Sequence, residues 1–366
     1  MEMDAVLQAG DAKDWAYKGE GAANLILSYT GSSPSMLGKV LRVKKILKDK
    51  SQPAPNCMVF SSHEQLLWGH IPELVESVKQ DCLNQAYAVH VMSQHLGANH
   101  VDGGVCIGVS RDFLELVEKN VLNSRPTWRV NASSVDSTAN VALLIADHSL
   151  FSGNAKDSSC IAVEIKFLVA WEVVRAVFIP DERDKCLEDL SKVSGLELSD
   201  FIELLSEAIF KSGVLRKLLA TQKLDDHDIE GAIHLYYNII SQPCLVCKNT
   251  TDAELLRKYA LLHSLSLDKS LKIVRDFLIS ATAKDCSLMI SFRPRESVIA
   301  ESEYDSVFLE SVERIYDYKA YFIDLDVKPL DKMEHYFKLD QKIVNFYTGN
   351  GEVGKSAKGS GTVTKH

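Results

Sequence analysis

Two aspartates stand at the ends of apolar segments, where a phosphoryl-transfer enzyme places its base and its metal ligand. Asp285 directly precedes the apolar run 286–292. Asp324 lies with Asp326 in the apolar segment 321–327. That segment has the period of two of a β-strand, so its carboxylates would project from one face into a shared cleft. An edge strand with a solvated face is the alternative, and this pair alone does not exclude it.

A glycine-rich turn near the N-terminus has the composition of a phosphate-binding loop. Residues 15–20 and 25–29 read as two strands around residues 21–24, and residues 38–43 read as a third strand that carries Arg42. Backbone amides in such a turn can approach phosphates closely because no bulky side chains intervene. The order resembles a kinase N-lobe, in which a third-strand cation meets the nucleotide phosphates. An ordinary hairpin with a surface cation is the alternative.

The segment after residue 140 is typical of a strand that ends in a polar hinge. A strand over residues 141–145 is expected to lead into Ala146, Asp147 and His148. Backbone groups of a short polar segment between two lobes could hydrogen-bond the edge of an adenine. His148 could also act as a general base, but a hinge or capping role is the preferred interpretation.

Two further segments present charged residues at their ends. Residues 161–166 alternate like a strand and place Glu164 and Lys166 on one side, although two opposite charges can also form a surface pair of little energetic value. Residues 270–279 have the spacing of a helix with one buried face, which would deliver Asp285 to its position.

Two cysteines and two histidines have the types and spacing of a structural zinc site. Cys244 and Cys247 form a C-x2-C pair, His234 lies ten residues earlier, and His263 lies sixteen residues later than Cys247. Thiolates and imidazoles in this number suit closed tetrahedral coordination. Two buried cysteines with unrelated histidines are the alternative, and His227 could replace either histidine.

Composition indicates a globular protein of one large or two medium domains. The chain has 366 residues, of which 46% are hydrophobic and 25% charged. Its net charge of −9 argues against nucleic-acid binding, which depends on a basic surface. Eight scattered cysteines and an N-terminus without a signal-peptide pattern predict a reduced protein of the cytosol or nucleus. The apolar run 167–180 contains Glu172 and Arg175 and is too short to span a bilayer, so no membrane association is expected.

A helix after Ser199 and a C-terminal tail are also predicted, and neither carries a catalytic signal. Ser199 is expected to cap a helix whose core-facing residues recur at helical spacing. Residues 346–366 are predicted to be a disordered tail, and its Gly-x-x-x-x-Gly-Lys string lacks the strand and helix of a phosphate-binding loop. The core-facing residues are Phe201, Leu204, Leu205, Ala208 and Ile209.

Eight stretches of the chain, in the same order, resemble the plant inositol-pentakisphosphate 2-kinases. They cover most of residues 11–166 and 195–345, and the longer ones are highly specific. The stretches are GEGAAN (19–24), GKVLRV (38–43), RPTWRVNA (125–132), DHSLF (147–151), VEIK (163–166), GVLRKLLATQKLDDHDIEGAIHLYYNIISQPCLVC (213–247), LDKSLKIVRDFLISATAKDCSLMISF (267–292) and YFIDLDVKPLDKMEHYFKLD (321–340).

The resemblance implies an α+β fold with the two lobes of a kinase. The N-lobe would span residues 1–150 and contain the glycine-rich hairpin and the hinge. The C-lobe would span residues 151–345 and contain the catalytic carboxylates, the inositol phosphate site and a structural zinc site. Such enzymes transfer the γ-phosphate of ATP to the axial 2-hydroxyl of inositol 1,3,4,5,6-pentakisphosphate, giving inositol hexakisphosphate (phytic acid).

The resemblance also implies roles for individual residues. Asp285 would orient or deprotonate the attacking hydroxyl, Asp324 would bind magnesium, and Lys166 would complete the catalytic group. Arg42 would meet the phosphates of ATP. The other nucleotide contacts would be Glu20, Gly21, Ala22, Ala23, Asn24, Ala146, Asp147, His148 and Glu164.

The inositol phosphate would be held by cations, because phosphoryl transfer consists mostly of positioning and charge neutralisation. The implied contacts are Arg129, Lys328, Lys332 and Tyr336. The family usually has arginine where this chain has Lys332, and lysine cannot form the bidentate fork that arginine makes with phosphate. The resemblance further implies a structural Zn²⁺ on His234, Cys244, Cys247 and His263, and a monomer is expected.

The chain departs from the family pattern between Lys166 and about residue 196. By comparison with that pattern, about eighty residues that include basic ligand contacts have no counterpart here. An alternative splice product or a mistaken gene model would give such a chain. The alternative function is therefore a catalytically impaired shortened isoform that retains partial nucleotide or inositol-phosphate binding. A protein kinase is disfavoured because the chain lacks H-R-D and D-F-G strings.

Overall fold

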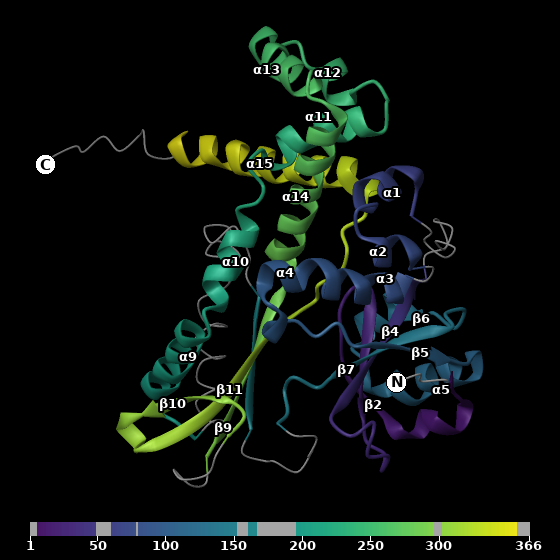
Figure 1. Cartoon of the computed structure of the whole chain (residues 1–366), viewed down its shortest axis with the longest axis vertical. Coiled ribbons are helices and arrows are strands. Elements are labelled where there is room, and N and C mark those ends of the chain that lie inside the picture. The colour runs from purple at the N-terminus through teal and green to yellow at the C-terminus, as the bar shows by residue number, and fades with distance from the viewer. Residues whose placement is uncertain are drawn as a thin grey trace, which may run out of the picture. The chain divides into compact units, whose positions relative to one another are not determined.

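The computed structural model describes residues 6–48, 60–77, 80–151, 160–166, 195–295 and 302–356 (Figure 1). They fall into two compact units. The first unit lies within residues 1–60, 68–222 and 282–327, and the second within residues 61–67, 223–281 and 328–366. The first unit thus contains segments from both sides of residue 150, and the lobe boundary expected there stays a prediction.

A mixed sheet in the first unit carries the glycine-rich turn. Its strand order is β1-β5-β7-β4-β3-β2, with β6 also paired to β4. Only β1 and β5 pair in parallel. The predicted hairpin, third strand and hinge strand are confirmed. The bounds are β1 (Val6–Leu7), β2 (Trp15–Glu20), β3 (Asn24–Tyr29), β4 (Lys39–Leu47), β5 (Val105–Val109), β6 (Ser133–Val135) and β7 (Val141–Ala146).

Alternation and helical spacing explain why this sheet packs against helix α5 (Arg111–Val121). Leu25 and Leu27 occupy alternate positions of β3 and are fully buried, as the period of two requires. Ser110 caps α5 by accepting a hydrogen bond from the Phe113 N–H. Phe113, Leu114, Val117 and Val121 then form the buried stripe of α5 and join the same core.

In the first unit, an antiparallel sheet brings the ends of three strands together at one edge. Its order is β10-β11-β9-β8, with bounds β8 (Ile161–Lys166), β9 (Ser287–Pro294), β10 (Asp305–Leu309) and β11 (Arg314–Ile323). Ser287 pairs with Lys166 on one side and with Ile323 on the other. The last residue of β8, the first of β9 and the last of β11 are therefore neighbours. Helix α14 (Leu267–Asp285) ends immediately before β9, as predicted.

Two local predictions were wrong. The strand expected over residues 321–327 ends at Ile323, and Asp324 adopts a positive φ of 62°. Strand β9 begins at Ser287, the partner of Ile323, so no β9 residue pairs with Asp324, and aspartate tolerates the left-handed region better than most residues. Ser199 is not the N-cap: α9 (Leu198–Ser212) is preceded by Glu197, which makes no side-chain cap. Leu205 and Ile209 are half-buried, whereas Phe201, Leu204 and Ala208 are buried as expected.

The second unit consists mainly of helices. Helix α11 (Asp228–Ile239) is joined to α15 (Met333–Ser356) by a hydrogen bond of 2.8 Å from the Tyr237 hydroxyl to Glu334. Helices α12 (Leu245–Asn249) and α13 (Ala253–His263) follow α11 and lie beside it (Figure 1). Helix α15 continues to Ser356, within the segment predicted to be a tail, and residues 357–366 lie outside the described residues.

The remaining helices are short or belong to the first unit. Among the described residues, no helix combines the length and the apolar character needed to cross a membrane. The segment 167–194, which includes the predicted apolar run, lies outside the described residues. The other helices are α1 (Ser62–Trp68), α2 (Pro72–Glu76), α3 (Gln80–Tyr87), α4 (Ser93–Leu96), α6 (Thr127–Ala132) and α10 (Val214–Gln222).

Replacing Phe113 by alanine should lower the free energy of unfolding by about 3–5 kcal/mol, because a fully buried ring is removed from the core between α5 and the first sheet. Leu116→Ala on the same helix is the matched control, since Leu116 is 37% exposed. Urea denaturation followed by circular dichroism measures both. Equal losses for the two variants would contradict this assignment of the core.

Candidate active site and metal centre

The predicted catalytic residues Lys166 and Asp285 meet at the edge of the second sheet. Lys166 is the last residue of β8 and Asp285 the last residue of α14. The Lys166 Nζ lies 3.5 Å from Asp285 Oδ1, and about half of each side chain is exposed. A carboxylate that is accessible and paired with a mobile cation is suited to accept a proton from a bound hydroxyl.

Asp324 joins this edge from the end of β11. Desolvation raises the pKa of its carboxyl, the nearby Arg42 cation opposes that shift, and the carboxylates of Asp326 and Glu164 add to it. Lys166 also acts on Asp324 and lowers its pKa. Asp324 itself is exposed, and its carboxylate offers the oxygen ligands that hard divalent cations prefer.

Arg42 connects the two sheets through a bidentate ion pair with Asp326. Its Nη1 donates to Asp326 Oδ1 at 2.7 Å, and its Nη2 donates to Oδ2. With the amide oxygen of Asn24 facing Arg42, that oxygen accepts from Nε at 3.2 Å and from Nη2 at 2.6 Å. Only 12% of the Arg42 side chain is exposed. The sequence pattern placed Asp326 with Asp324 in a shared cleft but did not predict its ion pair with Arg42.

The glycine-rich turn is exposed at residues 21–23 and held from below by Lys45. The Gly21 N–H donates to the Asn24 carbonyl at 3.0 Å, which closes the turn. Lys45 donates twice to the turn, from its backbone N–H to Ala23 at 2.8 Å and from its Nζ to the Gly21 carbonyl at 2.6 Å. The predicted nucleotide contact Glu20 has a side chain only 2% exposed, which pairs with Lys45 and Arg125.

The predicted adenine hinge is fixed by Asp102, a residue that sequence reasoning missed. Asp102 Oδ2 accepts the Ala146 N–H at 3.2 Å and lies 3.1 Å from His148 Nε2. The His148 ring stacks on Tyr321 of β11 with 3.8 Å between centroids. His148 is 9% exposed, which fits a hinge better than a general base. Asp147 pairs with Lys18 of β2 at 2.5 Å.

Desolvation alone would raise the pKa of Asp102, but hydrogen bonds from His148 and from the Gly104 and Ala146 amides lower it to about 2. The Asp147 carboxyl is likewise desolvated, and its pKa is lowered by Lys18 and Ser149. Both carboxylates are therefore ionised at neutral pH. They hold the end of β7 rigidly without titrating in the physiological range.

The four predicted inositol-phosphate contacts are divided between the two units. Arg129 lies on α6 in the first unit and is half-buried, with its guanidinium 4.1 Å from the Trp128 ring centroid. Lys328, Lys332 and Tyr336 lie in the second unit, the first two before α15 and the third on it. Each set is therefore described within its own unit.

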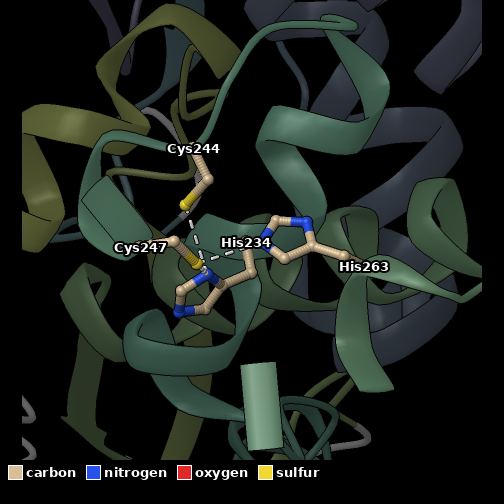
Figure 2. A group of neighbouring side chains, drawn as sticks. All are labelled: His234, Cys244, Cys247 and His263. Atoms are coloured by element: carbon tan, nitrogen blue, oxygen red, sulfur yellow. Dashed lines mark hydrogen bonds between the residues drawn. The ribbon is translucent and has the colours of Figure 1, made fainter. Parts of the chain in front are cut away.

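The predicted zinc ligands come together in the second unit (Figure 2). The ligand atoms of His234, Cys244, Cys247 and His263 all lie within 4.8 Å of one another. His234 Nδ1 is 3.3 Å from Cys244 Sγ and 3.5 Å from Cys247 Sγ. His263 Nε2 is 3.4 Å from Cys247 Sγ. His227, the sequence alternative, does not belong to this cluster.

These distances fit tetrahedral coordination of one ion. Zinc bonds of about 2.3 Å to sulfur and about 2.0–2.1 Å to nitrogen place neighbouring S and N ligand atoms roughly 3.5 Å apart. His263 Nδ1 lies 2.8 Å from Asn238 Oδ1, an outer hydrogen bond of the kind that orients a metal-binding imidazole. Burial and the neighbouring His263 lower the pKa of His234 to about 4, so its imidazole is neutral at pH 7. The four residues could hold a zinc ion.

The chain matches the family described as Inositol-pentakisphosphate 2-kinase over residues 17–167 and 173–342. Inositol-pentakisphosphate 2-kinase IPK1 of Oryza sativa subsp. japonica is 65% identical over 432 residues, covering 96% of this chain and 97% of the relative. The protein of subsp. indica gives the same figures. The inositol-pentakisphosphate 2-kinase of Arabidopsis thaliana is 38% identical over 433 residues, covering 94% of this chain and 95% of the relative.

The alignments with the rice relatives are longer than the chain itself. Their 432 aligned positions exceed the chain's 366 residues by 66. At least that many residues of each relative consequently have no counterpart in this chain.

Replacing Asp102 by asparagine should make the free energy of unfolding depend less on pH in the acidic range. A carboxylate whose pKa is lowered from 3.8 to about 2 stabilises the fold above pH 4, and this contribution disappears as the pH falls through 2. We expect the wild-type free energy of unfolding to fall more steeply than that of the variant between pH 5 and pH 3. Urea denaturation at several pH values measures the slopes. Asp305→Asn, which removes an exposed carboxylate, should leave the wild-type slope unchanged, and identical slopes for all three proteins would overturn the assignment.

Proposed function

This chain belongs to the inositol-pentakisphosphate 2-kinase family, and we propose that it transfers the γ-phosphoryl group of ATP to the 2-hydroxyl of inositol 1,3,4,5,6-pentakisphosphate. The observation that carries the proposal is the convergence of Lys166, Asp285 and Asp324 at one edge of the second sheet. The names of the relatives define the substrate and the position of transfer. The sheet edge supplies the carboxylates that this reaction requires.

Asp285 is the proposed base, because it is half exposed and can accept the proton of the 2-hydroxyl as the new O–P bond forms. Asp324 would hold Mg²⁺ with Asp326 or Glu164 nearby. When bound, Mg²⁺ neutralises charge that develops on the phosphoryl oxygens. Lys166, whose Nζ lies 3.5 Å from Asp285 Oδ1, would help to neutralise the same charge.

The first sheet would hold the nucleotide. The turn at Gly21, Ala22 and Ala23 is exposed and would present the backbone amides of Ala22 and Ala23 to phosphates, while the Gly21 amide closes the turn, and Asn24 and Arg42 lie at its base. Arg42 is pre-positioned by Asp326, so it need not lose rotamer freedom when phosphate binds. Ala146, Asp147 and His148 end β7 in the rigid hinge that would read the adenine edge, and Glu164 lies near Asp324.

The proposed contacts to inositol pentakisphosphate are Arg129 in the first unit and, in the second unit, Lys328, Lys332 and Tyr336. Arg129 is stacked on Trp128, which leaves its guanidinium edge free to meet a planar pair of phosphate oxygens. Lys332 is exposed and acts as a point charge where an arginine fork would be more selective. We expect this contact to add affinity with less discrimination among phosphate positions.

We infer that the residues without a counterpart fall directly after Lys166. The family match is interrupted between residues 167 and 173, which supports this position. If the interruption removes ligand contacts, the chain would bind its substrate more weakly than the relatives do. A shortened isoform that binds without turnover is the competing outcome, and the same assay decides between them.

We further propose that the His/Cys cluster holds one structural Zn²⁺. Four protein ligands leave no open coordination position, so a catalytic role is disfavoured. None of the described cysteines forms a disulfide, so Cys244 and Cys247 have thiols that zinc could bind. A monomer of the cytosol or nucleus stays our prediction.

Asp285→Ala should reduce turnover by about 10²–10⁴-fold, because the attacking hydroxyl loses its proton acceptor. Anion-exchange chromatography of inositol 1,3,4,5,6-pentakisphosphate incubated with Mg-ATP measures the hexakisphosphate formed. Asp112→Ala, at an exposed carboxylate of α5, is the control and should retain wild-type turnover. A folded wild-type chain that binds both ligands but forms no product would show that the shortened isoform is the correct description.

Cys247→Ser should abolish binding of one zinc per chain and lower the thermal stability of the second unit, since one of four ligands is lost. Elemental analysis and thermal denaturation measure these effects. Cys82→Ser is the matched control: Cys82 forms no disulfide and lies outside the cluster, so this variant should keep one zinc per chain. Zinc content equal in all three proteins, or absent from the wild type after refolding with zinc, would refute the site.

A further inference from the structure

A network of four charges lies beneath the glycine-rich turn; three of the side chains are buried, and that of Glu118 is 24% exposed. Arg125 donates to Glu20 through Nε at 3.0 Å and Nη2 at 3.1 Å, and to both Glu118 oxygens through Nη1 at 3.0 Å. Lys45 completes the network by pairing with Glu20. The side chains of Arg125, Glu20 and Lys45 are 0%, 2% and 1% exposed. Two carboxylates balance two cations, so no charge is left uncompensated in the interior.

One end of the network fixes the turn that would cover the nucleotide phosphates. Glu20 is the last residue of β2 and leads directly into the turn. The same Lys45 ammonium that pairs with Glu20 donates to the Gly21 carbonyl at 2.6 Å. Moving Glu20 would therefore release the cation that holds the turn.

The other end fixes helix α6, which carries Arg129. Arg125 immediately precedes Pro126, the N-cap residue of α6, and its Nη2 also donates to the carbonyl of Ser133, directly after α6, at 3.1 Å. One guanidinium thus holds the chain on both sides of the helix. Glu118 adds a further restraint by accepting the Val135 N–H at 3.0 Å.

The network and Arg129 share one electrostatic neighbourhood. Desolvation and the charge of Glu20 raise the pKa of Tyr17 on β2, and the charges of Arg125 and Arg129 lower it. The turn, the network and α6 consequently lie together in the first unit. A displacement of the Arg125 guanidinium would therefore also displace the turn and Arg129.

We propose that Arg125 and Glu20 are positioning residues that couple nucleotide binding at the Gly21–Ala23 turn to inositol-phosphate binding at Arg129. The inference rests on the function proposed above. Neither side chain touches a ligand, since both are buried and paired within the protein. When inositol phosphate orders α6, it also aligns the turn for the nucleotide, because the Arg125 guanidinium and its ion pairs hold both α6 and the turn.

The test measures binding and does not require turnover. Isothermal titration gives the dissociation constant of the magnesium complex of adenosine 5′-(β,γ-imido)triphosphate with and without saturating inositol 1,3,4,5,6-pentakisphosphate. We expect the wild-type constants to differ by at least about fivefold. In Glu20→Gln and in the conservative Arg125→Lys, which keeps the charge but loses the fork, the ratio should fall below about twofold.

Asp317→Asn is the matched control. Asp317 is also 2% exposed and also pairs with two cations, Arg293 and Arg295, but it lies on β11 away from the turn. It should lose comparable stability and keep the wild-type ratio, which separates coupling from general destabilisation.

Each outcome bears on the inference. A wild-type ratio retained by folded Glu20→Gln or Arg125→Lys protein would overturn it, as would an equal loss in Asp317→Asn. A wild-type ratio of one with both ligands bound would overturn it while leaving the proposed function intact. A folded wild-type chain that binds no inositol pentakisphosphate would remove the proposed function itself.

Discussion

The register of the second sheet is the constraint on which the candidate active site depends. Ser287 pairs with Lys166 on one side and with Ile323 on the other, so three segments from distant parts of the chain end side by side. Asp324 directly follows the aligned end of β11, and Asp285 lies two residues before the aligned start of β9. A slip of one residue in either pairing would exchange the faces of the strands and separate the catalytic groups.

Buried and half-buried charges organise the rest of the first unit. Glu20, Asp102 and Asp317 are each held by two or more donors, and each pins a different part of the backbone: the turn, the hinge and the outer end of the second sheet. Burying a carboxylate without such partners would cost several kcal/mol, so these arrangements exist in only one geometry. The site is therefore built on polar contacts that specify position, above a hydrophobic core that supplies stability.

Sequence patterns were sufficient where the signal is local. Strand alternation predicted β3, β4 and β8, and the spacing of His234, Cys244, Cys247 and His263 predicted the cluster that the structure brings together. Patterns failed where the determinant is a distant partner. The end of β11 at Ile323 depends on where β9 begins, and Arg42 and Asp326 are 284 residues apart. The periodicity of the sequence also could not predict the partners of Glu20 or the role of Asp102, because both depend on contacts between segments that are distant in the chain.

Helices α12 and α13 have no fully buried hydrophobic residue in their spans, and Leu245, Leu255 and Leu261 are exposed. A segment with so little apolar core cannot offset its own conformational entropy. With zinc bound as proposed, the ion would replace that core by closing the chain between His234 and His263. The folded fraction of this segment would then depend, through mass action, more on the free zinc concentration than on temperature. Metal supply in the cell would thereby become a variable that sets how much of the chain is fully folded.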